Sequence, residues 1–308
     1  MRQMISATTA IALVAAMTAA MPAMAQDDSM ADGAMQHDTQ MQHDTQMHHD
    51  TDMSHDMHAD QDMHGEHEMH DQHDGMMDHA DAMPQSLEDA VSDETRPEED
   101  RLLDVNRHPA EVLLFAGLEH GWRVADLTAG SGYYTRVLST AVGAEGHVYA
   151  HNPSWIAERF PEPNAALGML AEDRANVTHV VAPIETFAAD IDEPLDGVMM
   201  VLFYHDTAWD ETDRDAMNQA VYDALRPGGV YLVIDHHAPE GSGLEHVNTT
   251  HRIEASVVRA EIEAAGFVFD GESDMLANPD DPRDISVFDD SIRRMTDRFV
   301  YRFRKPEM

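Results

Sequence analysis

The chain of 308 residues carries a formal net charge of −40, with 59 acidic residues against 19 lysines and arginines. This balance argues against a nucleic-acid-binding role, because proteins that grip phosphate backbones present a basic surface. The chain contains no cysteine and therefore forms no disulfide. Its length suits one α/β domain with additional segments.

The first 25 residues have the pattern of a secretory signal peptide. Arg2 gives a positively charged start, residues 5–20 are apolar and rich in alanine, and Ala23-Met-Ala25 precedes Gln26 as a small-x-small cleavage site. The apolar stretch is short for a membrane span, and no later segment is long and apolar enough to cross a bilayer. We therefore expect cleavage after Ala25 and a mature protein in the periplasm or outside the cell.

Residues 26–83 form a low-complexity tail rich in histidine, methionine and aspartate. Residues 36–53 are three hexads: Gln-His-Asp-Thr-Gln-Met, the same again, and His-His-Asp-Thr-Asp-Met. The tail holds eleven of the 21 histidines and eleven of the 23 methionines. It has no aromatic and almost no aliphatic side chains, so no core can offset the entropy of ordering the chain. The composition predicts disorder.

The same composition indicates metal binding by the tail. Neutral imidazole binds copper, nickel and zinc, and thioether sulfur favours Cu(I). Disorder alone does not call for methionine at every sixth position, so we expect multiple exchanging copper sites. The alternative is a polar spacer without selected function. The candidate ligands are His37, Met41, His43, Met47, His48, His49, Met53, His55, Met57 and His58.

Residues 84–308 have the pattern of one α/β domain. Helical patterns over residues 98–105 and 110–118, expected to cover a ligand-binding side of the sheet, precede a strand that begins at Arg123. A turn of small residues and a helix to residue 138 follow. Further strands are predicted at 147–152, 177–181, 195–203, 230–235 and 298–304, with a helix at 213–225 and a turn at 226–229. Near-continuous apolar strands separated by helices predict a parallel sheet covered on both faces.

The turn after the first strand is the leading candidate for a ligand site. Thr128, Gly130 and Gly132 keep this turn free of bulk, so that backbone N–H groups at the helix start can approach a ligand. Asp126 ends the strand, and Asn152 ends the next strand about twenty residues beyond the glycines, where nucleotide-binding sheets usually carry an acid for the ribose. The alternative is a turn that only packs a helix against the sheet.

This order of elements resembles the class I S-adenosylmethionine-dependent methyltransferases. The matching segments are residues 124–132, 195–198 and 225–229. A closer resemblance, to a bacterial family of exported predicted methyltransferases, spans residues 85–308 through motifs at 107–109, 235–237, 250–253, 265–267, 278–282 and 296–306. The resemblance implies a Rossmann-like class I methyltransferase sheet, mostly parallel with an antiparallel last strand at 298–304. It also implies methyl transfer from S-adenosylmethionine to an unidentified, small-molecule acceptor.

Carried over residue by residue, the resemblance places the cofactor at Asp126, Thr128, Gly130, Gly132 and Asn152. Two positions depart from the family pattern: Thr128 replaces the first glycine of the turn, and Asn152 replaces the ribose-binding acid. An amide lacks the charge that strengthens a carboxylate hydrogen bond, so we expect weakened cofactor binding.

Histidines after the fourth and fifth strands are candidates for a general base. His205 is the first choice, because acceptors in this fold meet the cofactor beyond the fourth strand and Asp206 beside it can orient the ring. His251 is the second choice, because we expect it to begin a helix whose positive dipole end keeps it neutral. The alternative for each is a helix cap or a structural histidine.

Three functions remain open from the sequence. An active methyltransferase is favoured by Asp126, Gly130 and Gly132. A periplasmic copper- or metal-handling protein, whose domain keeps the fold without the activity, is favoured by the tail, by Thr128 and by export away from a cytosolic cofactor. The third function is a binding module for another nucleoside-like ligand.

Overall fold

The computed structural model describes residues 85–210 and 212–307. The predicted signal peptide (residues 1–25) and the predicted tail (residues 26–83), with all of its candidate metal ligands, lie outside the described residues.

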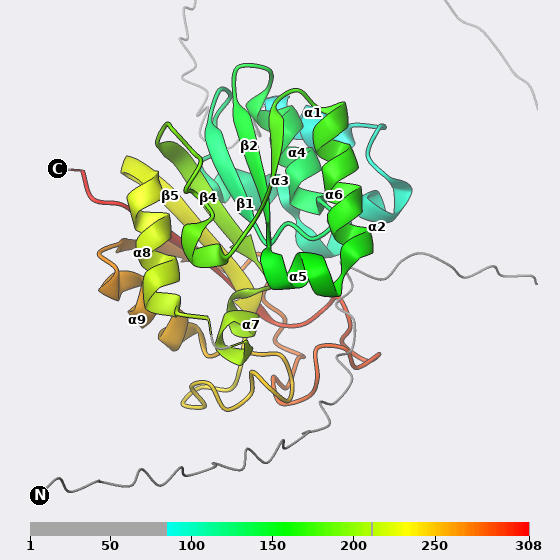
Figure 1. Ribbon diagram of the computed structural model, residues 1–308. Coiled ribbons are helices and arrows are strands. Elements are labelled where there is room, and N and C mark those ends of the chain that lie inside the picture. Colours follow the sequence, from blue (N-terminus) through cyan, green and yellow to red (C-terminus); the bar gives the residue numbers. More distant parts are fainter. Residues whose placement is uncertain (1–84, 211, 308) are drawn as a thin grey trace, which may run out of the picture.

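A seven-stranded sheet in the order β3-β2-β1-β4-β5-β7-β6 forms the centre of the domain (Figure 1). Strands β1 to β5 pair in parallel, and β7 pairs antiparallel with both β5 and β6. The strands are β1 Arg123–Leu127, β2 His147–Pro153, β3 Val177–Ala182, β4 Leu195–Val201, β5 Leu225–His236, β6 Val268–Ser273 and β7 Arg298–Arg304. The sheet confirms the predicted class I methyltransferase topology, including the antiparallel last strand.

Helices alternate with these strands. They are α1 Gln85–Ser92, α2 Glu98–Arg107, α3 Pro109–Ala116, α4 Tyr133–Val142, α5 Ser154–Arg159, α6 Pro161–Asp173, α7 Tyr204–Trp209, α8 Arg214–Ala224 and α9 Ala255–Ala264, with the 3-10 turn η1 Ile184–Thr186. Within the two described ranges, no helix is long and apolar enough to cross a membrane.

One predicted turn and one strand differ between the sequence prediction and the structure. The predicted turn at 226–229 lies inside β5, where Gly228 adopts a positive φ of 76° and the pairing with β4 shifts register. Strand β6 was not predicted, because its residues alternate between exposed and half-buried around Gly271 and form no apolar run. Only pairing with β7 makes this segment a strand.

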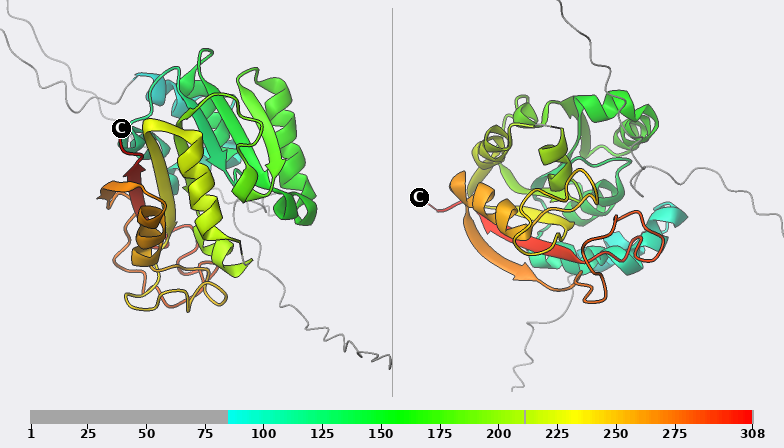
Figure 2. Two further views of the ribbon diagram at one scale, coloured as in Figure 1. Left: turned by 60° about the vertical axis from the view of Figure 1, so that its left-hand side comes forward. Right: turned by 90° about the horizontal axis from the view of Figure 1, so that it is seen from below.

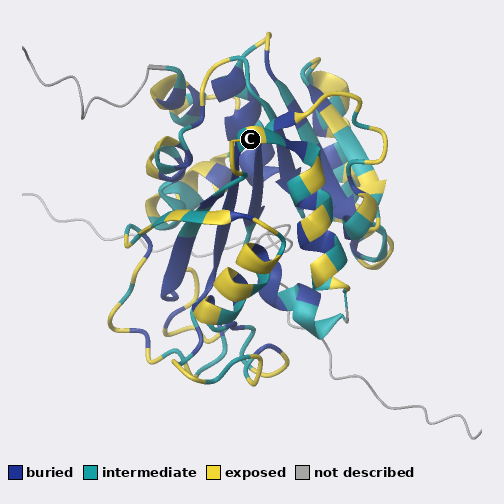
Figure 3. Ribbon diagram, turned by 90° about the vertical axis from the view of Figure 1, so that its left-hand side faces the viewer, coloured by how far each residue is buried: buried dark blue, intermediate teal, exposed yellow. Residues whose placement is uncertain are grey.

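The sheet separates two hydrophobic clusters (Figure 3). Successive strand residues belong to different clusters: Val124 to one and Ala125 to the other, and likewise Leu232 and Val233. This alternation puts the first cluster under α1, α3 and α4 and the second under α8 and α9. Both faces are therefore covered, as near-continuous apolar strands require.

Two long loops gather where the parallel strands end, at the lower end of the domain in Figure 1 (Figure 2). Residues 237–254 follow β5, and residues 274–297 precede β7. Arg252 joins them: it donates to the carboxylate of Asp281 at 3.0 Å and to the carbonyls of His237 and Ile285. Both charged side chains are fully buried.

This buried pair generates a stability prediction. Removing one partner leaves an uncompensated buried charge, so Arg252→Met should lower the free energy of unfolding by about 3–5 kcal/mol. The matched control is Arg259→Met, because Arg259 pairs with Glu263 on the exposed surface of α9, and its loss should cost about 0.5 kcal/mol or less. Urea unfolding measures both; equal losses in the two variants would contradict the assignment.

Candidate functional site

The turn between β1 and α4 lies at the point where the order of the strands switches sides: β2 and β3 lie on one side of β1, and β4 and β5 lie on the other. Ligands of open α/β sheets bind at such a switch point. The turn adopts left-handed backbone at three positions, with φ of 61° at Thr128, 60° at Gly130 and 95° at Gly132. Thr128 therefore adopts a left-handed conformation that favours glycine and is unusual for a β-branched residue.

Asn152 clamps this turn. Its Oδ1 accepts from the Gly130 N–H at 2.9 Å, and its Nδ2 donates to the Gly130 carbonyl at 3.0 Å and to Asn164. A carboxylate could accept but not donate, so the amide is the group that satisfies both the N–H and the carbonyl of one residue. This clamp is a role that sequence reasoning missed, because it joins residues 22 positions apart.

The remaining backbone of the turn is also bonded within the protein. The Ala129 N–H donates to the His151 carbonyl, and the Gly132 N–H donates to the Ala129 carbonyl. A side chain at Gly132 would meet Leu170 at 2.7 Å and Leu167 at 3.0 Å on α6. The N–H groups of Ala129, Gly130 and Gly132 thus shape the turn.

Asp126 lies buried between β1 and α4. Its Oδ2 accepts from the Thr135 hydroxyl at 2.6 Å. Burial raises the pKa of Asp126 to about 7, against the opposing effects of the Thr135 hydrogen bonds and the charge of Arg107. The side chain that was predicted to contact a ligand therefore also fastens the helix to the strand.

A histidine cluster stands at the ends of β4 and β5. The buried carboxylate of Asp235 accepts from the His205 backbone N–H at 2.8 Å and pairs with His205 Nδ1 at 2.7 Å. It also accepts from the His236 N–H at 2.7 Å. Because a carboxylate only accepts, His205 donates from Nδ1, and in its neutral form Nε2 carries a lone pair.

The structure brings the two predicted histidines together. Their ring centroids are 5.6 Å apart, and Asp206 Oδ1 lies 3.4 Å from His205 Nε2 and 3.6 Å from His251 Nδ1. One expectation was wrong: His251 does not begin a helix, since α9 starts at Ala255 and His251 adopts a positive φ of 55° in the preceding loop. His251 therefore does not stand at the positive end of a helix dipole, as had been expected from the sequence.

His205, Asp206 and His251 also form a group able to hold a metal ion. One ligand atom from each lies within 4.8 Å of the others. Sequence reasoning had named both histidines as bases and had placed metal binding only in the tail. The signal was the sequence His205-Asp206 after one strand and Asp235 after the next, but only the fold shows that His251 completes the group.

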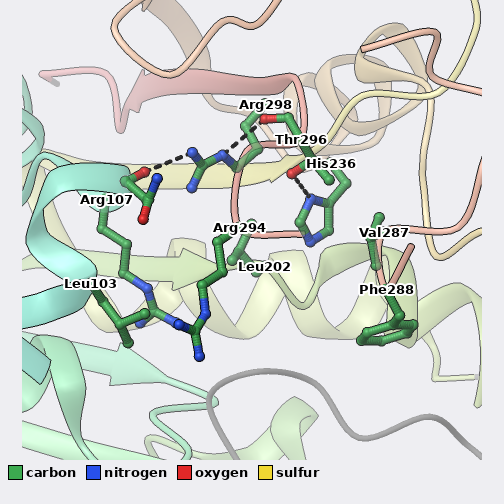
Figure 4. Close-up of a pocket in the computed structure, with 10 residues that line it drawn as sticks. Leu103, Arg107, Leu202, His236, Val287, Phe288, Arg294, Thr296 and Arg298 are labelled. Carbon is green, nitrogen blue, oxygen red and sulfur yellow. Dashed lines mark hydrogen bonds between the residues drawn. The ribbon is translucent and has the colours of Figure 1, made fainter. Parts of the chain in front are cut away.

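A small pocket with an accessible volume of about 30 Å³ lies beside this cluster (Figure 4). Three arginines line it: Arg107 from α2, Arg294 from the second loop and Arg298 from β7. Arg298 donates to the Asn106 carbonyl at 2.7 Å, and burial lowers its pKa to about 10. The arginines give this pocket a positive lining in a strongly acidic protein.

His236 connects the pocket with the cluster. It lines the pocket, its ring centroid lies 5.7 Å from that of His205, and its Nδ1 bonds to the Thr296 hydroxyl at 2.7 Å (Figure 4). Burial holds the pKa of His236 well below its ordinary value, so the ring is neutral at physiological pH. Phe288 also lines the pocket and packs on His251.

No protein-family model and no curated protein matches the chain. Among solved structures, the chain is similar to an S-adenosylmethionine-dependent methyltransferase from Aquifex aeolicus, with 19% identity, coverage of 64% of this chain and 89% of that one, and a TM-score of 0.46. It is similar to the N-methyltransferase NodS from Bradyrhizobium japonicum, with 12% identity, 68% and 99% coverage and a TM-score of 0.48. It is also similar to an arsenic(III) methyltransferase from Chlamydomonas reinhardtii, with 19% identity, 74% and 75% coverage and a TM-score of 0.46. The fold class itself follows from the strand order and directions.

The raised pKa of Asp126 predicts a pH-dependent stability. Below about pH 4 the acid is protonated in both the folded and the unfolded chain, and above pH 7 it is ionised in both. Between these values only the unfolded chain ionises, so its contribution to stability falls as pH rises. Asp126→Asn mimics the protonated acid. Its free energy of unfolding should exceed that of the wild type by about 1–3 kcal/mol at pH 8, and by less at pH 5. Urea unfolding from pH 5 to 8 measures this, with the exposed Asp223→Asn as control; a pH-independent difference would contradict it.

Proposed function

We propose that this protein is an exported methyltransferase that transfers a methyl group from S-adenosylmethionine to a small-molecule acceptor. The observation that carries the proposal is the glycine turn at the switch point of a 3-2-1-4-5-7-6 sheet with an antiparallel β7. Export is supported by the signal-peptide pattern of the first 25 residues.

The residues present fit the cofactor in shape more than in charge. Thr128, Gly130 and Gly132 keep the left-handed backbone of the turn, and at Gly130 this conformation disfavours any side chain. Asn152 supplies no negative charge for a ribose and is bonded to Gly130. When bound, S-adenosylmethionine supplies an electrophilic methyl group on a sulfonium; this chain's turn would position it next to the ends of β1 and β4.

The acceptor we propose carries an anionic group. Arg107, Arg294 and Arg298 line the pocket beside the ends of β4, β5 and β7, and guanidinium groups bind carboxylate or phosphate through paired hydrogen bonds. His205 lies next to His236, which lines the pocket. Asp235 holds the His205 ring through Nδ1, and its Nε2 lies 3.4 Å from Asp206 Oδ1. With no metal ion bound to it, this nitrogen would take up the proton that the acceptor loses.

Calorimetric titration of the purified protein with S-adenosylmethionine tests the proposal. We expect binding at one site and at least a tenfold weaker affinity in Gly130→Val, which corresponds to about 1.4 kcal/mol. Gly117→Val is the matched control, because Gly117 also has a positive φ of 73° but lies at the end of α3, where an added Cβ would meet no atom within 4 Å. Circular dichroism checks that both variants fold. Absence of binding by the wild-type protein would refute the proposal.

A second candidate function, metal handling, is favoured by the eleven histidines and eleven methionines of residues 26–83. We expect the full chain to bind several copper ions at neutral pH and fewer at pH 5, because imidazole must lose its proton to ligate. Deleting residues 30–83 should remove most of this copper and leave the methyltransferase-like domain folded. Equal copper stoichiometry with and without these residues, measured by equilibrium dialysis, would exclude the tail as the binding segment.

A further inference from the structure

The ligand atoms of His205, Asp206 and His251 have the spacing of a metal site. Asp206 Oδ1 lies 3.4 Å from His205 Nε2 and 3.6 Å from His251 Nδ1. Ordinary N–H···O bonds are shorter, about 2.7–3.2 Å. Zinc bonds of about 2.0–2.2 Å to nitrogen and oxygen, at tetrahedral angles, separate neighbouring ligand atoms by about 3.3–3.5 Å. The two distances therefore match the edges of a coordination polyhedron closely.

A second, independent observation points the same way. Asp235 is fully buried and holds His205 through Nδ1 at 2.7 Å, so that the lone pair of the neutral ring lies on Nε2, the atom nearest Asp206. A carboxylate behind a ligating imidazole fixes the tautomer and the ring orientation in many metal sites.

The charges and the surroundings suit a cation. The carboxylates of Asp206 and Asp235 lie beside the two imidazoles, and the His205 and Asp206 side chains are mostly shielded from solvent, at 4% and 17% exposure. Phe288 and His236, which contact His251 and His205, also line the arginine pocket. A metal at this place therefore borders the pocket in which we place the acceptor.

We propose that His205 Nε2, Asp206 Oδ1 and His251 Nδ1 bind a divalent first-row transition ion, with Asp235 as the residue that positions His205. Two imidazoles and one carboxylate are a ligand set that zinc and iron accept, and three protein ligands leave positions open. The binding of metal is independent of the proposed function. Its role rests on that function: an open position would hold an electron-pair donor of the acceptor and lower the pKa of a proton on it.

Thermal unfolding of the full-length protein with Zn²⁺ tests the site. After removal of metal by a chelator, Zn²⁺ at about 100 times its dissociation constant should raise the melting temperature by about 5–10 °C. Metal that the tail binds equally in the folded and the unfolded chain does not contribute to this shift. His251→Ala and Asp206→Asn should abolish the shift; both side chains are only partly buried, so these variants should fold.

Two further variants sharpen the result. His246→Ala, in the same loop as His251, should keep the full shift, because His246 is bonded to Thr250 and is not one of the three ligands. Asp235→Asn should weaken Zn²⁺ affinity about 10–100-fold, as expected for a residue that orients a ligand. No shift in wild type, or an undiminished shift in both His251→Ala and Asp206→Asn, would overturn the site.

Titration with S-adenosylmethionine in the same preparations separates the two proposals. Cofactor binding without any Zn²⁺ shift would refute the metal site alone. A Zn²⁺ shift that depends on His251 and Asp206, without cofactor binding, would support the metal site and refute the methyltransferase.

Discussion

The buried carboxylate of Asp235 is the interaction on which the functional end of this domain depends. Burying a charge is costly unless hydrogen bonds compensate it, and Asp235 receives them from two backbone N–H groups and one imidazole. These bonds tie the start of α7 to the end of β5 and fix the ring of His205. Because Asp206 follows His205 and His236 follows Asp235 in the chain, the same bonds also help to fix the positions of Asp206 and His236.

At the end of β1, the turn of residues 128–132 also needs partners for its backbone N–H and carbonyl groups. In this chain the residue at the end of β2 is an asparagine, whose amide satisfies both the N–H and the carbonyl of Gly130. The turn is therefore rigid before any ligand arrives, and Thr128 is held in a left-handed conformation that its branched side chain disfavours.

Charge is distributed with a clear contrast between the pocket and the rest of the molecule. A chain with a net charge of −40 nevertheless gathers Arg107, Arg294 and Arg298 around one pocket. The cost of burial is visible in the lowered pKa of Arg298. Beside the arginines lies the cluster of Asp206, Asp235, His205, His236 and His251, whose two carboxylates favour a bound cation. An anionic acceptor and a cation would thus meet complementary surfaces side by side.

The sequence by itself determined six of the seven strands, because apolar runs and alternating aromatic residues are local patterns. The antiparallel direction of β7 was expected from the resemblance to class I methyltransferases. The sequence also placed Gly130, Gly132 and His205 at strand ends. Only the tertiary structure decided that Asn152 clamps Gly130, that Asp235 holds His205 and that β6 is a strand. It also moved His251 from an expected helix start into a loop that faces Asp206. These contacts join residues 22 to 45 positions apart, and no periodicity in a sequence specifies which polar groups will meet across a sheet.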